Sequence, residues 1–371
     1  MERRNVGILG ATGAVGQRFI QLLENHPWFN ITWLAASDRS AGKTYAEACN
    51  WRLDTPLPAR IADMTLQPNV PEGDFPRIIF SSVDAPIARE LEPKFAAAGC
   101  AVISNSSAFR MAPDVPLVVP EVNADHFEVI ESQPSRKATG GFLVTNPNCC
   151  AIGLVLPLAP LHAAFGIEQL FVSTMQAVSG AGYPGVASLD ILGNVIPYIK
   201  NEEEKLQEEV GKLLGGADSR SFHPLDAKVS AHCNRVAVID GHTECVSIKL
   251  SKRATYEEIV AAWEGFQPLS GRGHEGLHLP SAPLFPVEYA AEEARPQPRL
   301  DLMRGNGMAT TVGRLRPCSL FDWKFVLLSH NTIRGAAGAA ILNAEILAVL
   351  GKFDFRKWPV QTAEIAAAVP A

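Results

Sequence analysis

The feature that most constrains the fold is a glycine-rich turn near the start of the chain. It reads G-I-L-G-A-T-G-A-V-G at 7–16, and it joins a strand-like run at 5–9 to residues with helical apolar spacing at 14–24. Glycines let the backbone turn sharply and approach a ligand, and the following helix offers free N–H groups to an anion. Strand, turn and helix in this order predict a pyrophosphate site for a dinucleotide, although a G-x-x-G-x-x-G turn without a ligand is the plainer alternative.

The end of the next strand bears on which dinucleotide is bound. It reads A-S-D-R-S-A-G-K at 36–43. An acidic residue such as Asp38 usually holds the ribose hydroxyls of NAD, whereas Arg39 flanked by Ser37 and Ser40 suits a 2′-phosphate. Because Asp38 can point outward, we predict NADP.

Strands and helices alternate through the first part of the chain. Further strand-like runs lie at 31–36, 77–82 and 100–104, with a helical run at 86–98. This alternation predicts βαβ units and a parallel sheet, that is, an α/β Rossmann-type dinucleotide-binding domain.

The pattern changes after residue 148. Long alternating runs at 169–178, 242–250, 308–315 and 323–329 predict an α+β catalytic and dimerisation domain whose mainly antiparallel sheet packs one face against a twin subunit. The apolar run at 151–165 reads as a buried helix, and 271–299 as a long surface loop. A final helix at 334–350 is expected to return to the first domain. We therefore expect residues 1–148 and 334–371 to form the NADP-binding domain, and 149–333 the catalytic and dimerisation domain.

Composition excludes several classes of protein. The formal net charge of −6 opposes nucleic acid as a partner. No run is long and apolar enough to predict a membrane span or a signal peptide. The seven cysteines are odd in number and include no C-x-x-C pair, which opposes a disulfide framework and a zinc site. We expect a cytoplasmic protein without a bound metal.

A cysteine follows a second strand, at T-N-P-N-C-C-A, residues 145–151. A cysteine at a helix N-terminus has its thiolate stabilised by the helix dipole, so Cys149 is the candidate nucleophile. Cys150 and the other five cysteines read as small buried hydrophobes. The proton-transfer partner could be His232 or His242; His242 lies where a turn enters a long strand, but sequence physics alone leaves its role about even with a structural one.

Several motifs together resemble the aspartate-semialdehyde dehydrogenase family. They are N-P-N-C at 146–149, Q-A-V-S-G-A-G-Y-P-G at 176–185, R-V-A-V-I-D-G-H-T-E at 235–244, S-N-S-S-A-F-R at 104–110, N-E-E-E-K at 201–205 and H-N-T-I-R-G-A-A-G at 330–338. The last motif and the length are similar to the archaeal and fungal branch. The resemblance runs from Gly7 to Glu345, nearly the whole chain.

The resemblance implies a role for each matching residue. Cys149 would be the nucleophile, His242 the general acid/base, and Gln176 would position the acyl group. Substrate binding would fall to Arg235 on the carboxylate, to Arg110 and Lys205 on the phosphate with Asn105 nearby, and to Glu202 on the amino group. Cofactor contacts would come from Gly10, Thr12, Gly13, Ala14, Val15, Ser37, Arg39, Ser40, Ser82, Ser179, Gly180 and Asn331, the last at the nicotinamide end.

Some of these residues have plainer explanations. Glu202 and Lys205 could be an i,i+3 pair on a solvated helix face, and Arg110 and Arg235 could form surface ion pairs of little consequence. The family also usually has Ser or Thr after the nucleophile, where this chain has Cys150. A thiol is a weak hydrogen-bond donor, so the exchange bears on substrate or cofactor placement.

The implied reaction is the NADPH-dependent reductive dephosphorylation of L-4-aspartyl phosphate to L-aspartate 4-semialdehyde, through a thioester on Cys149, in amino-acid biosynthesis by a homodimer or homotetramer. Within enzymes, the alternatives are reduction of an acyl-CoA such as malonyl-CoA, and reduction of N-acetylglutamyl phosphate, which fits the motifs less well. Outside that class, the alternatives are a cofactor-free Cys/His acyltransferase or hydrolase and a non-catalytic binding module.

Overall fold

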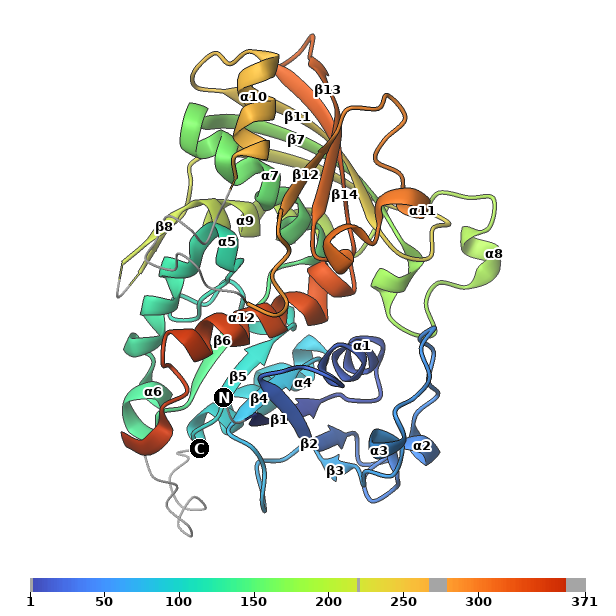
Figure 1. The fold of residues 1–371 in the computed structure, drawn as a ribbon, viewed down its shortest axis with the longest axis vertical. Coiled ribbons are helices and arrows are strands. Elements are labelled where there is room, and N and C mark those ends of the chain that lie inside the picture. Colours follow the sequence, from blue (N-terminus) through green and yellow to red (C-terminus); the bar gives the residue numbers. More distant parts are fainter. Residues whose placement is uncertain (1–2, 219–220, 267–278, 358–371) are drawn as a thin grey trace.

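The protein is built around two six-stranded sheets, one in each half of the molecule. A computed structural model describes residues 3–218, 221–266 and 279–357. In Figure 1 the first sheet lies below and the second above, and the late helix α12 (Gly338–Val349) runs between them. Within these described ranges, no helix has the length and apolar content needed to cross a membrane.

The first sheet is entirely parallel, with the strand order β3-β2-β1-β4-β5-β6. Its strands are β1 (Arg4–Leu9), β2 (Phe29–Ala36), β3 (Gln67–Pro68), β4 (Ile78–Ser81), β5 (Ala101–Ser104) and β6 (Phe142–Thr145). Every residue of β4, β5 and β6 is buried, as expected for parallel strands covered on both faces. This order is that of a dinucleotide-binding Rossmann fold.

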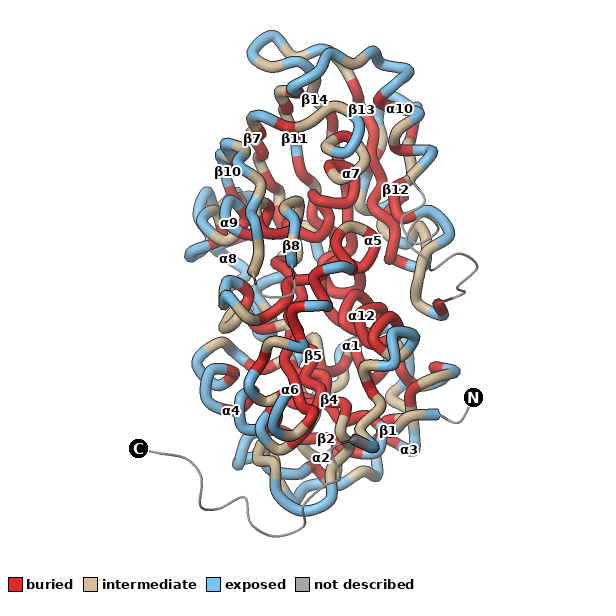
Figure 2. The backbone as a smooth tube through the Cα atoms, turned by 90° about the vertical axis from the view of Figure 1, so that its left-hand side faces the viewer, coloured by how far each residue is buried: buried red, intermediate tan, exposed pale blue. Residues whose placement is uncertain are grey.

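Helices cover both faces of this sheet. Phe19 and Ile20 of α1 (Ala14–Leu23) join Ile341 and Ile346 of α12 in one apolar core, whereas Phe95 of α4 (Ala85–Ala97) packs in a core on the opposite face. The remaining elements before β7 are α2 (Tyr45–Ala48), α3 (Ala59–Ala62), η1 (Ser107–Phe109), α5 (Pro120–Asn123), η2 (Ala124–Ser132) and α6 (Pro134–Thr139). Figure 2 shows the buried backbone continuing through α12, which the final apolar run at 334–350 predicts.

The second sheet is mixed and mostly antiparallel, with the order β10-β7-β11-β14-β13-β12. Its strands are β7 (Ile167–Gln176), β10 (Lys228–Arg235), β11 (His242–Leu250), β12 (Val287–Ala290), β13 (Thr310–Pro317) and β14 (Trp323–Ser329). The three inner pairings are antiparallel, and the edge strands β10 and β12 pair in parallel.

Only one face of this sheet is fully packed. Apolar residues of α7 (Cys149–Phe165), α9 (Glu202–Leu214) and α10 (Tyr256–Glu264) form a core with the inward side chains of the strands. On the other face Phe171, Ser173, Met175 and Thr243 are only partly buried, and Cys245 is exposed. The other elements here are η3 (Val178–Ala181), α8 (Ser188–Ile191), β8 (Gly216–Ala217), β9 (Phe222–His223), α11 (Pro298–Asp301), η4 (Arg304–Gly307), η5 (Ile333–Ala337) and η6 (Phe355–Lys357).

The predicted surface loop at 271–299 is wrong in part. Residues 271–278 lie outside the described residues, but 287–290 form β12 and 298–301 form α11. Four residues are too few to show an alternating pattern, so β12 depends on its parallel partner β13 for its hydrogen bonds. The final helix also differs, because it opens with a π-helical turn, η5, before α12.

Candidate active site

Cys149 is the first residue of α7, directly after the chain leaves β6. Asn148 caps this helix, and its Oδ1 accepts hydrogen bonds from the N–H groups of Cys150 (2.8 Å) and Ala151 (3.3 Å). The helix is apolar on all sides, with Leu156 among its buried residues. A rigid, buried helix therefore holds the sulfur at its positive dipole end.

His242, the first residue of β11, lies against this sulfur. Its Nε2 is 3.2 Å from Cys149 Sγ, and its Nδ1 accepts a hydrogen bond from the N–H of Ala177 (3.1 Å). His242 is fully buried, whereas Cys149 keeps intermediate exposure. The predicted pair of nucleophile and proton-transfer partner is therefore brought together, and the sulfur is not sealed in an apolar core.

The thiol of Cys149 is activated by its surroundings. A hydrogen bond with the Cys150 thiol lowers the pKa of Cys149 well below its ordinary value; burial opposes this shift, and His242 and Arg110 reinforce it. Burial, with the neighbouring Cys149, raises the pKa of Cys150 well above its ordinary value. Of the two adjacent cysteines, only Cys149 has its thiolate form favoured by its surroundings.

Two acids of α9 fix the position of Asn148. Its backbone N–H donates to Glu209 Oε2 (2.5 Å), and its side-chain Nδ2 donates to Glu202 Oε1 (2.7 Å). Gln176, the last residue of β7, donates to the same Glu202 oxygen (3.3 Å), and Lys205 Nζ lies 3.5 Å from Glu202 Oε2. Glu202 is buried, so the solvated-face explanation does not hold for it.

Arg110 is also buried and belongs to the same network. Its Nη1 pairs with Glu209 Oε1 (2.9 Å) and its Nη2 donates to the carbonyl of Asn105 (2.9 Å), while its Nε has no hydrogen-bond partner. The side chain of Asn105 accepts a hydrogen bond from Asn146 Nδ2 (2.8 Å). Arg110 is therefore not part of a surface ion pair of little consequence, and its Nε remains able to donate a hydrogen bond to an anion.

Arg235 approaches the site from the edge strand β10, where it pairs in register with Gln176. Its Nη1 donates to the carbonyl of Ala177 (2.9 Å). Gly180 gives it room, since a Cβ at this position would lie 2.8 Å from Arg235 Nη1 and 3.1 Å from His242 Cε1. Gly180, Arg235 and His242 thus line one wall of the site.

The glycine turn has the geometry of a ligand cradle. Gly10 has φ +73°, and a Cβ there would lie 3.0 Å from the carbonyl oxygen of Ser82. Gly13 precedes α1 without a side-chain cap, so the first N–H groups of the helix, beginning with those of Ala14 and Val15, are open to a ligand. The Ser82 hydroxyl donates to the carbonyl of Leu9 (2.9 Å) and so secures the turn.

Other residues predicted to bind the cofactor lie after β2, in the glycine turn and near Gly241. Ser37 and Arg39 are exposed after β2, and Ser40 is half-buried. Asn331 Nδ2 donates to Ser179 Oγ (2.8 Å), and its Oδ1 accepts from the N–H of Gly241 (2.8 Å). Thr12 is half-buried in the turn and its carbonyl accepts from Gln17 (3.2 Å). Ala14 and Ser179 together line a hollow of about 290 Å³.

Three residues of the site are assigned no role by the sequence analysis. Glu209 lies seven residues after Glu202, on the same face of α9. Glu244 follows His242 by two residues, on the same face of β11; it is fully buried, neither of its oxygens has a hydrogen-bond partner, and burial raises its pKa well above the ordinary value. Gly335, in η5, packs so closely that a Cβ would lie 2.7 Å from Cys149 Cβ. Strand and helix periodicity could have flagged the two acids, but nothing local marks Gly335.

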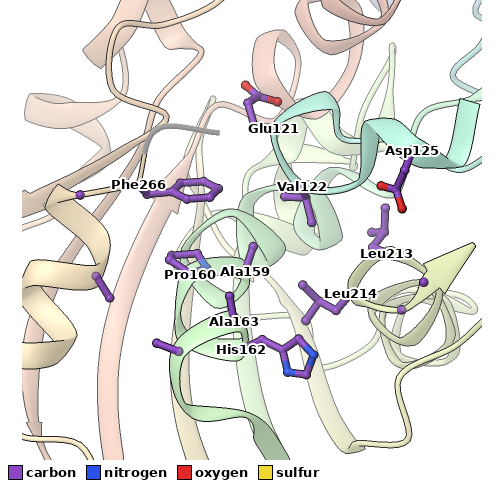
Figure 3. Close-up of a pocket in the computed structure, with 15 residues that line it drawn as sticks. Glu121, Val122, Asp125, Ala159, Pro160, His162, Ala163, Leu213, Leu214 and Phe266 are labelled. Atoms are coloured by element: carbon purple, nitrogen blue, oxygen red, sulfur yellow. The ribbon is translucent and has the colours of Figure 1, made fainter. Parts of the chain in front are cut away.

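A separate hollow of about 850 Å³ lies toward the other end of α7. Figure 3 shows its lining, in which His162 and Pro160 of α7 face Val122, Leu214 and Phe266. None of the predicted site residues borders it. The candidate active site is therefore the cluster at the N-terminus of α7.

Cys149 Sγ, Cys150 Sγ and His242 Nε2 also form the one set of three potential metal ligands, within 4.8 Å of one another, in the described ranges.

Comparison with known proteins covers nearly the whole chain. Residues 5–130 match the family described as semialdehyde dehydrogenase, NAD binding domain, and residues 158–334 match semialdehyde dehydrogenase, dimerisation domain. The aspartate-semialdehyde dehydrogenase of Archaeoglobus fulgidus is 51% identical over 345 residues, which cover 93% of this chain and 98% of that protein.

Solved structures agree with this. The aspartate-semialdehyde dehydrogenase of Candida albicans, crystallised with NADP, aligns with a TM-score of 0.86 at 45% identity and covers 94% of this chain and 99% of that one. Aspartate-semialdehyde dehydrogenase II of Vibrio cholerae, complexed with ASA, aligns with a TM-score of 0.73 at 27% identity, covering 94% of this chain and 99% of that one.

Proposed function

Because the chain belongs to the aspartate-semialdehyde dehydrogenase family and has that enzymatic activity, we propose that Cys149 carries the reaction as a thioester with the acyl group of L-4-aspartyl phosphate. The observation that carries this proposal is the 3.2 Å contact between Cys149 Sγ and His242 Nε2 at the start of α7. In the reductive direction the thiolate attacks the acyl carbon, phosphate leaves, and reduction of the thioester releases the semialdehyde and regenerates the thiolate.

A thioester suits this chemistry for a physical reason. An acyl phosphate is open to hydrolysis, whereas an acyl group bonded to Cys149 stays in place until it is reduced. Charge develops on the carbonyl oxygen in each tetrahedral species and needs hydrogen-bond donors, which the backbone N–H of Cys149 can supply with His242. His242 is proposed as the acid/base partner of the sulfur.

The substrate is held by charged groups around the thiolate. Arg235 takes the carboxylate as a bidentate pair, and Glu202 takes the amino group. Arg110 and Lys205 take the phosphate, with Asn105 behind Arg110. Support comes from burial: Arg110, Arg235 and Glu202 are each at least nine-tenths buried, and a buried charge is maintained only where partners or ligands compensate it. Gln176 orients the acyl group.

NADP(H) is the proposed cofactor, as in the Candida albicans structure. The uncapped start of α1 and the close approach allowed at Gly10 fit a pyrophosphate. Arg39 with Ser37 and Ser40 holds the 2′-phosphate. The remaining contacts are those implied for Thr12, Gly13, Ala14, Val15, Ser82, Ser179, Gly180 and Asn331. When bound, NADPH supplies the hydride that reduces the thioester.

We propose a cofactor domain made of residues 1–148 and 334–371 and a catalytic domain made of residues 149–333. Residues 358–371 lie outside the described residues. The match to a dimerisation domain makes the protein a homo-oligomer. We place the subunit interface on the half-exposed face of the second sheet, and the size is a dimer or a tetramer. The seven cysteines are all free, which supports a reducing, cytoplasmic setting.

Steady-state assays test the substrate assignment. Oxidation of NADPH should be rapid with L-4-aspartyl phosphate and negligible with malonyl-CoA, because Arg110 and Lys205 suit a compact phosphate and Glu202 suits an amino group. The aspartyl phosphate product should be identified as the semialdehyde by mass spectrometry. Faster turnover of the acyl-CoA would overturn the substrate assignment and leave the thioester chemistry standing.

A further inference from the structure

Lys212 of α9 is a cation buried inside the protein, with 3% of its surface exposed. Its Nζ donates to three backbone carbonyls, those of Arg110 (2.7 Å), Ala112 (3.0 Å) and Val115 (2.9 Å). A lysine is rarely buried this far without partners, and an ammonium has three N–H groups to satisfy. Each of the three has a carbonyl here.

The surroundings of this side chain keep it charged at neutral pH. Burial lowers the pKa of Lys212 to about 8, and the negative charges of Glu209 and Asp114 oppose that shift. The ring of Phe222, in β9, lies 4.0 Å from Nζ, where the electron-rich face of an aromatic ring attracts a cation. Because the pKa stays above neutrality, Lys212 has all three N–H groups available at pH 7.

The three carbonyls belong to a segment that has no helix or strand. Residues 110–115 follow η1 as a series of turns. Within the segment and its neighbours, the N–H of Ala112 donates to the carbonyl of Phe109 (3.0 Å) and that of Val115 to Ala112 (3.4 Å). Lys212 brings three carbonyls of these turns to one point, and so it fixes the backbone from which the Arg110 side chain extends.

The helix that provides Lys212 also holds the other end of Arg110. Glu202, Lys205, Glu209 and Lys212 follow one another at three- and four-residue intervals, so they share one face of α9. The Arg110 guanidinium pairs with Glu209 (2.9 Å), while the Arg110 carbonyl accepts from Lys212. The same face of one helix therefore contacts both the backbone and the guanidinium of Arg110.

Resting on the function proposed above, in which Arg110 and Lys205 take the phosphate, we propose that Lys212 is a positioning residue of the phosphate site. It holds the backbone of Arg110 against α9, and α9 carries Lys205. The two phosphate-binding cations thereby stay at a fixed separation, although they come from different halves of the chain. Lys212 acts through Arg110 and does not itself contact the substrate.

A general contribution to stability is the plainer role for a buried lysine. Buried carbonyls that lose their donors destabilise a protein wherever they lie, so a melting temperature cannot distinguish the two roles. The KM for inorganic phosphate can. In the oxidative direction the enzyme consumes phosphate as a separate substrate, so this KM is measured independently of the KM for the semialdehyde.

Arg136 of α6 provides a matched control. It is also buried and donates to backbone carbonyls, those of Gly140 (3.0 Å) and Lys352 (3.2 Å). It lies near the start of β6, whereas Cys149 follows the end of that strand, and Figure 1 shows α6 at the lower end of the molecule and α9 in the upper half. Methionine in place of either cation keeps an unbranched side chain and removes every N–H donor.

Both K212M and R136M should melt at a lower temperature than the wild type. Only K212M should raise the KM for phosphate, by roughly tenfold, because a small displacement of a positioned group weakens its contacts strongly. The KM for the semialdehyde should stay near the wild-type value in both variants. A wild-type phosphate KM in K212M, or an equal rise in R136M, would overturn the proposal.

A double-mutant cycle tests whether Lys212 acts through Arg110. It uses K212Q, which keeps two N–H donors without a buried charge and so covers the case in which K212M folds poorly. R110K and K212Q should each raise the phosphate KM, and the double variant should be little worse than R110K, which has no guanidinium left to position. Effects that multiply in full would contradict the proposal. An unchanged phosphate KM in R110K would instead refute the role of Arg110 in the proposed function.

Discussion

Two strand-to-helix turns leave the same parallel sheet and treat the start of the following helix differently. Between β1 and α1, Gly13 provides no side-chain cap, and glycines keep the turn open. Between β6 and α7, Asn148 closes the helix end, and two buried acids, Glu202 and Glu209, hold Asn148 in turn. The first N–H groups of α1 therefore have no side-chain acceptor and can bind a ligand, whereas N–H groups at the start of α7 donate to the side chain of Asn148.

In both turns the N-terminus of a helix can stabilise an anion, a pyrophosphate at α1 and the Cys149 thiolate at α7. An open helix end suits an anion that arrives from solution, such as a pyrophosphate. A capped helix end, with Cys149 as its first residue, suits an anion that belongs to the chain, because the sulfur must be held to a fraction of an ångström.

The first variant, C149A, removes the thiolate at the start of α7. C149A should lower kcat by on the order of 10⁴-fold or more, because no other group can form the thioester. Binding of NADPH, followed by its fluorescence, should be nearly unchanged, since the open turn belongs to a different helix.

C150S is the matched control. It retains a small polar side chain that the family commonly has at this position, and it should retain most of the turnover. Substantial activity in C149A, or loss of activity in C150S alone, would move the nucleophile to Cys150.

The second prediction concerns the pH dependence of the thiol. Since the pKa of Cys149 lies well below its ordinary value, its thiolate is expected to persist to lower pH than that of an ordinary thiol. In the wild-type enzyme, iodoacetamide labelling of Cys149 should therefore be nearly level around pH 7 and exceed that of a normal thiol by roughly 30-fold. A rate still rising about tenfold per pH unit above pH 7 would show an unactivated thiol.

How much of the candidate site could be predicted from the sequence depends on how far apart in the chain the residues in contact lie. Gly10 and Cys149 sit in short local patterns, strand then turn then helix, so both turns could be located from the sequence. The pairing of Cys149 with His242 needed the family resemblance, because 93 residues separate them. Glu209 could have been flagged only by its helical spacing from Glu202, and Gly335 carries no local signal; their roles come from contacts with Asn148 and Cys149.

Fold prediction shows the same limit. The long alternating strands β7, β11 and β14 are evident from their period. The edge strand β10 is interrupted by polar residues, and β12 has four residues, so each depends on the neighbour to which it bonds. Edge strands derive their structure from the sheet more than from their own sequence.

The third variant narrows the open turn. A Cβ at Gly16 would lie 2.4 Å from the carbonyl oxygen of Gly10, so G16A must push the helix away from the turn. We expect about 1–3 kcal/mol loss of stability and roughly tenfold weaker NADPH binding. G216A is its control, since no atom lies within 4 Å of a Cβ there. Unchanged affinity in G16A would argue against the turn as the cofactor cradle.

The smallest effect is expected at the cap of the closed turn. N148A should lower the free energy of unfolding by about 1 kcal/mol, and T255A, which removes the cap of α10, should do the same. Only N148A should also slow labelling of Cys149, because Thr255 is far from the site in the fold. Equal labelling rates in the two variants would show that Asn148 is only a structural cap.

The most direct test of the thioester is to trap it. The enzyme is mixed with L-4-aspartyl phosphate without NADPH, quenched in acid, and digested for mass spectrometry. An aspartyl group is expected on Cys149, and it should disappear when NADPH is added before the quench. An unmodified Cys149 under conditions that support turnover, or an acyl group on Cys150 instead, would contradict it.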